Sequence, residues 1–406
     1  MEQAKQTNSK IRFSGVELLR IIAILLICFH HANQTAQGML SLPLNFSRLT
    51  LNIVSYFGQI GNILFIICSA WFLLDSKRTK TEKIINLALD STFISILIFV
   101  GFVCGGYTFS SHDILMQFLP DIFQNVWFVP FYIVFYAIHP LLNGAIEKMS
   151  KKTHFIVCTI IFVLSAFQVF SNVGMDSLTC FILIYFVVAF FKKYKQDFCW
   201  SKKKNLIAFL ISFFVFIALV VAKNLLAETI PYFGMTFRLD SLISPVLLPM
   251  LIFLFNIFNN MKFKNKAINY LASMSLFVYC FHENILLRYL IRPKFYEYVF
   301  GINGDLYFWW IVLCAVGMFV GAYILSLIYK ETFHRFTSFL SKQLSKLFAI
   351  IGAFLFKIVM KENVQNEENK KTETINSEKE ILETKGELQQ KTNNSDFWET
   401  ENLTNK

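Results

Sequence analysis

Long runs of apolar residues, separated by short polar stretches, recur along the chain from residue 16 to residue 330. Each run approaches the length of about 20 residues that an α-helix needs to cross the hydrocarbon core of a bilayer. The runs predict ten membrane-spanning helices, at 16–37, 53–75, 84–103, 126–146, 154–171, 177–192, 205–222, 238–258, 270–290 and 306–329. We therefore expect an all-α, polytopic membrane protein.

Composition agrees with this pattern. Of the 406 residues, 55% are hydrophobic and 17% aromatic, and the mean hydropathy is +0.51, so most of the chain cannot face water. The first run is not typical of a cleaved signal peptide, because it is long, carries charges, and is not followed by a small-residue cleavage site after Asn33.

Basic residues occupy alternate loops. The loops expected on one side, with the N-terminal segment, hold Lys5, Lys10, Arg12, Lys77, Arg78, Lys80, Lys83, Lys148, Lys151, Lys152, Lys192, Lys193, Lys195, Lys202, Lys203, Lys204, Lys262, Lys264 and Lys266. The loops between them are poor in Lys and Arg. By the positive-inside rule, ten spans then place both termini in the cytoplasm. These anchors also explain the net charge of +11, and nothing gathers them on a soluble face that would bind nucleic acid.

Four regions are expected. A cytoplasmic segment, 1–15, precedes a ten-helix membrane domain, 16–330. Basic and apolar positions alternate over 331–360, which predicts a cytoplasmic amphipathic helix on anionic lipid, with an eleventh span at 344–359 as the alternative. Residues 361–406 are rich in Glu, Lys, Asn and Thr and predict a disordered cytoplasmic tail.

The first span carries ionisable residues that are costly inside a bilayer and mark a functional site. At about 100° per residue, Arg20 and His31 lie within about 20° of one helix face and roughly 16 Å apart along the axis. Glu17 falls about 40° from His31, whereas His30 points about 80° away. Arg20 and His31 could therefore bind the two ends of one elongated ligand.

Other readings of these residues are structural. The Arg20 side chain could simply extend to the membrane interface, and His31 could be a buried helix histidine. Glu17 could cap the helix, or it could pair with Arg20 one turn on. His30, which faces elsewhere, is expected to be structural. Trp127 could be an interface aromatic. The ninth span holds His282 and Glu283, which could touch substrate or form a buried pair with Arg288 or Arg238. Arg238 could equally pair with Asp240, and no partner can be named for Asp90 in the third span.

Eight cysteines are scattered singly and suit packing rather than chemistry. No metal-ligand spacing appears, so we expect no metal site.

Five stretches, in order, resemble the acyltransferase-3 family of membrane O-acyltransferases. They are Glu17-x-x-Arg20 followed after ten residues by His31-Ala32, Gly58-x-x-Gly61 with Ser69-Ala70-Trp71-Phe72, Trp127-Phe128-Val129-Pro130, Tyr185-Phe186 with Ala189, and Tyr279 with His282-Glu283. The resemblance covers about 12–330. Ala70 and Ala189 stand where the family commonly has Gly, and both are small.

The resemblance implies transfer of an acyl group, usually acetyl, from cytoplasmic acetyl-CoA to a hydroxyl of a surface polysaccharide, cell-wall polymer or glycolipid, in a bacterial plasma membrane. Acetyl-CoA is then a donor substrate and no cofactor is permanently bound. The roles it implies are catalysis for His31, Arg20 and Glu17, donor binding for Arg20, Lys77, Arg78 and Lys83, and substrate or structural contacts for Trp127, Arg238, His282 and Glu283. The residue chemistry agrees, because histidine suits a general base near neutral pH and arginine suits phosphates. His31 could act as general base on the acceptor hydroxyl, or become acetylated itself and pass the group outward.

Two other classes would also place charges within spans. A transporter or flippase of a lipid-linked saccharide would often show internal repeats, and none is evident. A polysaccharide polymerase would need a long outer loop, whereas the longest here have only about 20 residues.

Overall fold

The computed structural model describes residues 13–34, 45–123, 126–170, 175–194, 200–230, 238–294 and 307–354. The chain divides into two compact units, Met1–Ser341 and Lys342–Lys406. In the second unit, residues 342–354 are described, and they are helical. Most of the expected N-terminal segment and the expected disordered tail, 361–406, lie outside the described residues, and the lipid contact expected for 331–360 stays a prediction.

The described part of the chain is helical and contains no strand, as the sequence predicts. Its helices are α1 (Gly15–Gln34), α2 (Phe46–Ser55), α3 (Phe57–Leu73), α4 (Thr81–Cys104), α5 (Ser111–Phe118), α6 (Phe128–Lys148), α7 (Lys151–Phe170), α8 (Ser177–Lys193), α9 (Lys202–Thr229), α11 (Leu247–Asn259), α12 (Lys266–Ala272), α13 (Ser275–Glu283), a π-helix (Leu287–Ile291) and α15 (Tyr307–Thr332).

Several helices begin at a polar residue whose side chain binds a free backbone N–H group. Asp176 accepts from Thr179 N at 2.9 Å before α8, and Ser201 accepts from Lys204 N at 3.3 Å before α9. Asn265 does the same for α12. These caps fix where each helix starts.

Seven described helices are long and apolar enough to cross a membrane: Gly15–Asn33, Arg48–Leu73, Thr81–Cys104, Phe128–Lys148, Lys151–Val169, Lys202–Thr229 and Phe308–Thr332. The protein is thus an all-α, polytopic membrane protein. The other three expected spans are shorter or interrupted: α8 has 17 residues, α11 has 13, and 270–290 is divided among α12, α13 and the π-helix. The expectation of one continuous helix over 270–290 is wrong, and the count of ten stays a prediction.

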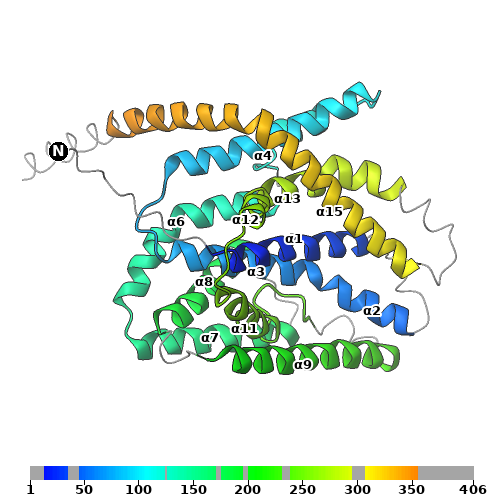
Figure 1. Ribbon diagram of the computed structural model, residues 1–406, viewed down its shortest axis with the longest axis vertical. Helices are drawn as coiled ribbons and strands as arrows, with labels where there is room; N and C mark the ends of the chain where they lie inside the picture. The colour runs from blue at the N-terminus through cyan, green and yellow to red at the C-terminus, as the bar shows by residue number, and fades with distance from the viewer. Residues whose placement is uncertain are drawn as a thin grey trace, which may run out of the picture. The chain divides into compact units, whose positions relative to one another are not determined.

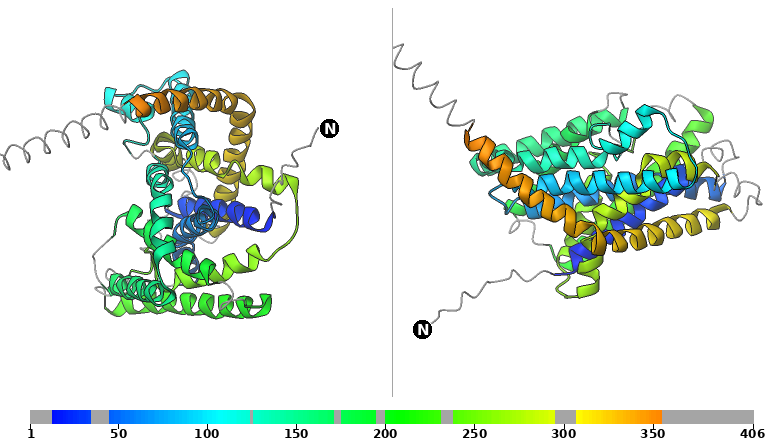
Figure 2. Two further views of the ribbon diagram at one scale, coloured as in Figure 1. Left: turned by 90° about the vertical axis from the view of Figure 1, so that its left-hand side faces the viewer. Right: turned by 90° about the horizontal axis from the view of Figure 1, so that it is seen from above.

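Helix α1 is the central element of the first unit (Figure 1, Figure 2). It contacts α2, α3, α11, α12, α13 and α15, so the helix that carries the charged residues is surrounded by protein. Helices α1 and α3 pack closely at two glycines of α3. A Cβ atom on Gly58 would lie 2.5 Å from the His30 ring, and one on Gly61 would lie 2.6 Å from Ala23 O. Small residues of this kind let membrane helices come close together.

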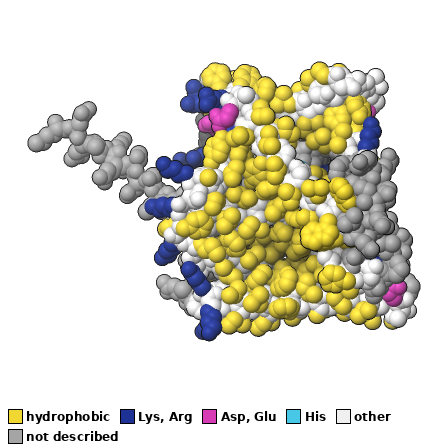
Figure 3. Space-filling view, turned by 45° about the vertical axis from the view of Figure 1, so that its right-hand side comes forward, with side chains coloured by type: hydrophobic (Ala, Val, Ile, Leu, Met, Phe, Trp, Pro, Cys, Tyr) yellow, Lys and Arg dark blue, Asp and Glu magenta, His cyan; other side chains and the backbone are white. Residues whose placement is uncertain are grey.

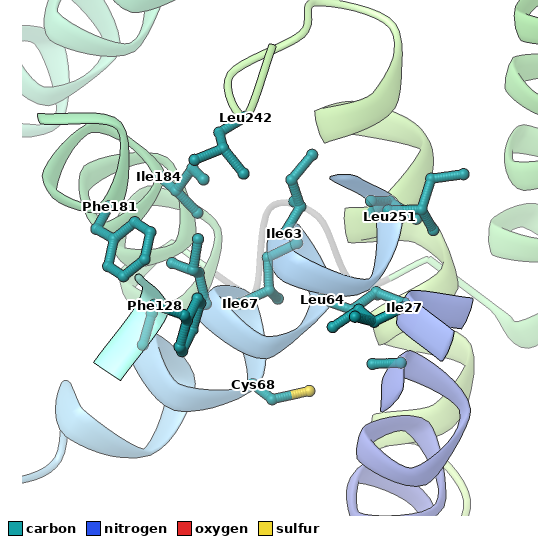
Figure 4. Close-up of a cluster of buried hydrophobic side chains, with 14 of the residues drawn as sticks. Ile27, Ile63, Leu64, Ile67, Cys68, Phe128, Phe181, Ile184, Leu242 and Leu251 are labelled. Atoms are coloured by element: carbon teal, nitrogen blue, oxygen red, sulfur yellow. The ribbon is translucent and has the colours of Figure 1, made fainter. Parts of the chain in front are cut away.

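Apolar side chains fill the interior and also cover the outside. Ile27, Ile63, Phe128, Phe181 and Leu251 meet in the buried cluster of Figure 4. On the exterior, large side chains remain exposed on α6, α7, α9 and α15, as expected for surface in contact with lipid tails. Figure 3 shows one such apolar face, with Lys and Arg side chains gathered along one edge.

Candidate functional site

The structure brings His31 of α1 together with His282 and Glu283 of α13, although the two segments are about 250 residues apart. The Nδ1 atom of His31 lies 2.9 Å from Glu283 Oε2 and 3.1 Å from His282 Nε2. All three residues are buried, Glu283 at 2% exposure. We call this group the His–His–Glu cluster; it places two residues named as substrate or structural candidates beside the one named as catalytic.

Two arginines hold the Glu283 carboxylate. Arg288 Nη1 donates to Oε1 at 2.9 Å, and Arg292 Nη2 donates to Oε2 at 2.9 Å. Arg292 also donates to the backbone carbonyl of His282. The expected partner Arg288 is therefore present and the alternative Arg238 is not, because the Arg238 side chain lies 3.7 Å from Asp240 instead. The sequence analysis did not identify Arg292 as a site residue.

An interrupted helix makes the Arg292 contact possible. In a continuous α-helix, Arg292 would lie about 900° and roughly 13.5 Å beyond Glu283, on the opposite face. Here α13 ends at Glu283, the next residue, Asn284, has a non-helical backbone (ψ 136°), and the π-helix follows. π-helical segments of this kind are frequent at functional sites. The break turns Arg292 back onto the carboxylate.

Asn284 stabilises this break with hydrogen bonds on both sides of its amide. Its Oδ1 accepts from Leu286 N at 2.9 Å, and its Nδ2 lies 3.3 Å from both Ser95 Oγ and Gln117 Oε1. Ser95 in turn donates to Gln117 at 2.8 Å. Irregular backbone is tolerated at membrane depth where protein satisfies its polar groups.

The hydrogen bonds of the cluster determine which ring nitrogens carry protons. His282 Nδ1 lies 2.9 Å from the Val278 carbonyl, which can only accept, so Nδ1 of His282 is protonated and its Nε2 carries a lone pair. His31 Nδ1 must then be the donor toward both His282 Nε2 and Glu283. In the neutral ring this leaves the lone pair on Nε2 of His31, as a base requires. A carboxylate that accepts from Nδ1 also stabilises the imidazolium that forms after proton transfer.

The same donor atoms lie within 4.8 Å of one another, a spacing that a metal ion could bridge. The net charge around the cluster argues against metal binding. With neutral imidazoles, one carboxylate beside two guanidinium groups has a net positive charge, which opposes a divalent cation. The expectation of no metal stays a prediction, and this arrangement favours it.

Arg20 and Glu17 form the pair expected one turn apart on α1. Arg20 Nη1 lies 3.2 Å from Glu17 Oε2 and 3.4 Å from Oε1, and its guanidinium lies over the Phe72 ring at 5.4 Å. Glu17 is buried, whereas the Arg20 side chain keeps 21% of its surface exposed. The pair holds Arg20 in position with part of the guanidinium accessible.

That accessible part lines a cavity of about 210 Å³, which we call the inner cavity. Arg20 and Lys83 lie toward the lysine-rich ends of their helices, and Ile27 and Tyr279 line the cavity further along α1 and α13. His31 is one turn beyond Ile27, and His282 and Glu283 are one turn beyond Tyr279. Of the basic residues expected to bind the donor, Arg20 and Lys83 line this cavity. Lys77 and Arg78 are exposed in the loop before α4 and do not line it.

A second cavity, of about 250 Å³, lies at the opposite ends of the helices; we call it the outer cavity. Trp127 and Arg238, two of the expected substrate or structural residues, both line it. The two candidate pairs therefore separate: Trp127 and Arg238 lie at the outer cavity, whereas His282 and Glu283 lie with His31.

Two further polar residues of the spans, His30 and Asp90, have structural partners. His30 Nδ1 lies 2.5 Å from Ser55 O, and its ring packs on Gly58, in line with the expected structural role. Asp90, for which the sequence offers no partner, accepts from Tyr329 Oη at 2.7 Å and Thr337 Oγ1 at 2.6 Å, with His334 Nδ1 at 3.1 Å.

A buried histidine whose Nδ1 lies against a carboxylate, one helical turn beyond the inner cavity, has a geometry suited to proton transfer. The chain belongs to the acyltransferase-3 family, whose model, described as an acyltransferase domain, matches residues 13–327. It is therefore a membrane acyltransferase. Comparisons with curated proteins and with solved structures find no match.

Proposed function

We propose that the protein transfers an acetyl group from acetyl-CoA to a hydroxyl of a cell-surface glycan or glycolipid, with His31 as the general base. The observation that carries this proposal is the inner cavity, which is lined by Arg20 and Lys83 and extends to Ile27 and Tyr279, each one helical turn before the His–His–Glu cluster. Family membership supports acyl transfer; the donor, the acceptor and the site roles are our inference.

The donor would enter from the lysine-rich face, which the positive-inside rule assigns to the cytoplasm. Arg20 and Lys83 suit its phosphates, since guanidinium and ammonium groups form charge-assisted hydrogen bonds to phosphate oxygens. The thin pantetheine arm would follow the inner cavity between Phe65 and Tyr132. The thioester would then reach Ile27, which is about 6 Å, or four residues, from His31 along α1.

In the chemical step, His31 Nε2 takes the proton of the acceptor hydroxyl while the hydroxyl oxygen attacks the thioester carbonyl carbon. The carbon–sulfur bond breaks, and the CoA thiolate takes the proton back from the imidazolium. Glu283 would stabilise the imidazolium through Nδ1 in the interval. The carboxylate behind the histidine favours this direct path over a relay through an acetylated histidine, which remains the alternative course.

Two measurements test the function. Cells with and without the chain are compared for acetyl esters on surface carbohydrate, which should be present only with it. The purified protein in lipid nanodiscs should release CoA from acetyl-CoA when the envelope glycan is added. Normal glycan acetylation in cells that lack the chain, together with no CoA release, would refute the proposal and favour a flippase, which does not consume acetyl-CoA.

A further inference from the structure

The outer cavity is made by helix ends that all lie opposite the lysine-rich face. Gln59 is at the start of α3, Trp127 precedes α6, Gln168 is near the end of α7, Ser177 begins α8, and Arg238 precedes α11. By contrast, the other ends of these same helices carry lysines, as at Lys148 and Lys193. The outer cavity is thus on the side that the positive-inside rule assigns to the exterior.

The lining of the outer cavity is polar but not predominantly of one charge. The Oε1 atom of Gln59 is buried and has no hydrogen-bond partner among the described residues. Gln168 Oε1 accepts from Ser241 Oγ at 2.6 Å, and Arg238 and Asp240 bring one charge of each sign. A buried amide oxygen without a donor costs free energy, so a ligand that brings an O–H group would be favoured.

Trp127 adds an aromatic surface to these amide and hydroxyl groups. An indole offers a broad apolar face with a polar edge, which complements a sugar ring that has C–H groups on its faces and hydroxyls around its rim. Binding sites typically combine such a surface with a few placed polar groups. The combination fits an uncharged saccharide unit better than a lipid tail or an anion.

A thin aromatic layer separates the outer cavity from the inner cavity. Trp127 lines the outer cavity, and the adjacent Phe128 lines the inner cavity. On α3, Gln59 lines the outer cavity and Asn62 lines the inner cavity, about 4.5 Å further along the helix axis. The Phe128 ring packs against Phe181 at 5.2 Å and Tyr279 at 5.7 Å between centroids, the first of these contacts being visible in Figure 4. The outer and inner cavities are therefore lined by neighbouring residues, with the Phe128 ring on the inner side.

We propose that the outer cavity binds one uncharged saccharide unit of the acceptor, against Trp127 and the Gln59 amide, and presents its hydroxyl across the Phe128 layer. This inference rests on the proposed function and names the class of acceptor for it. It assigns Gln59 and Ser177, which no sequence motif singled out, to acceptor binding.

Two variants test the assignment without disturbing the donor side. Gln59→Leu removes an amide oxygen that bonds nothing in the described protein, so its fold should be retained. Ser177→Phe fills the cavity, and Leu141→Phe, at a lipid-facing position that is 76% exposed, serves as its size control. Each variant is measured for acetyl esters on envelope carbohydrate in cells and, after purification into nanodiscs, for binding of radiolabelled acetyl-CoA.

We expect Gln59→Leu to lower carbohydrate acetylation about fivefold, the effect of one lost hydrogen bond. Ser177→Phe should reduce it to background, Leu141→Phe should leave it unchanged, and all three should bind acetyl-CoA normally. Wild-type carbohydrate acetylation in both cavity variants would overturn the inference and leave the proposed function standing, as would acetyl esters found on lipid alone. Loss of acetyl-CoA binding in Gln59→Leu would also overturn it. A wild-type protein that acetylates nothing would refute the proposed function itself.

Discussion

Glu283→Gln removes the charge that orients His31 and leaves the shape of the side chain almost unchanged. Glu283 Oε2 accepts from His31 Nδ1 at 2.9 Å, whereas a glutamine amide turned toward His31 would donate and favour the opposite tautomer, with the proton on Nε2. Losing the correct base typically costs about 10²–10⁴ in rate. We therefore expect kcat to fall by that factor, which is about 3–5 kcal/mol of transition-state stabilisation.

The same substitution should also reduce stability, because it leaves Arg292 and Arg288 without their carboxylate. Breaking a buried ion pair by removing one partner costs about 3–5 kcal/mol. The double variant Glu283→Gln/Arg292→Gln also removes the charge of Arg292, which is the more buried of the two arginines. It should therefore regain much of the thermal stability that Glu283→Gln loses. It should regain none of the activity, since His31 is still without its acceptor.

The assay is the initial rate of CoA release in nanodiscs at saturating acetyl-CoA, normalised to folded protein and run beside thermal unfolding. An activity loss that merely follows the folded fraction, and that the double variant reverses, would refute the orienting role. It would make Glu283 a structural partner of the two arginines.

Three further outcomes are expected. Arg20→Ala should raise the apparent KM for acetyl-CoA by about tenfold or more and Arg20→Lys by less, because a charge-assisted phosphate contact is worth about 1.5–3 kcal/mol; an unchanged KM in both would assign Arg20 to anchoring. Gly61→Ala should destabilise the protein by about 1–3 kcal/mol in thermal unfolding, since its Cβ would meet Ala23 O, whereas Gly101→Ala, with nothing within 4 Å, should be neutral. Activity should survive dialysis against EDTA, and its loss with recovery on adding zinc would overturn the charge argument against a metal.

Hydrophobic runs were sufficient to predict the helical membrane architecture and the extent of most of the long helices. They could not show that 270–290 is interrupted, because the stretch is apolar on the whole and contains no glycine or proline that would mark a break. The interruption depends on Asn284 meeting Ser95 and Gln117, and contacts between distant segments leave no periodic signal.

At the site, local geometry was predictable and long-range geometry was not. The Glu17–Arg20 pair follows from helical spacing alone, and so does the shared face of Arg20 and His31. The contact of His31 with Glu283 joins helices about 250 residues apart, and Arg292 reaches it only through the helix break. The sequence could therefore name these residues as candidates but could not assemble them.

The central claim is that His31, and not its neighbour, is the base that the His–His–Glu cluster orients. The most direct measurement compares the rates of acetyl transfer to the envelope glycan by purified His31→Ala and His30→Ala, with acetyl-CoA binding measured for each. We predict that His31→Ala lowers the rate by a factor of about 10²–10⁴ while it still binds the donor. His30→Ala, which loses a packing contact with Gly58, a bond to Ser55 O and a ring contact with His31, should lower the rate less. Normal transfer by His31→Ala, with loss in His30→Ala, would contradict the account.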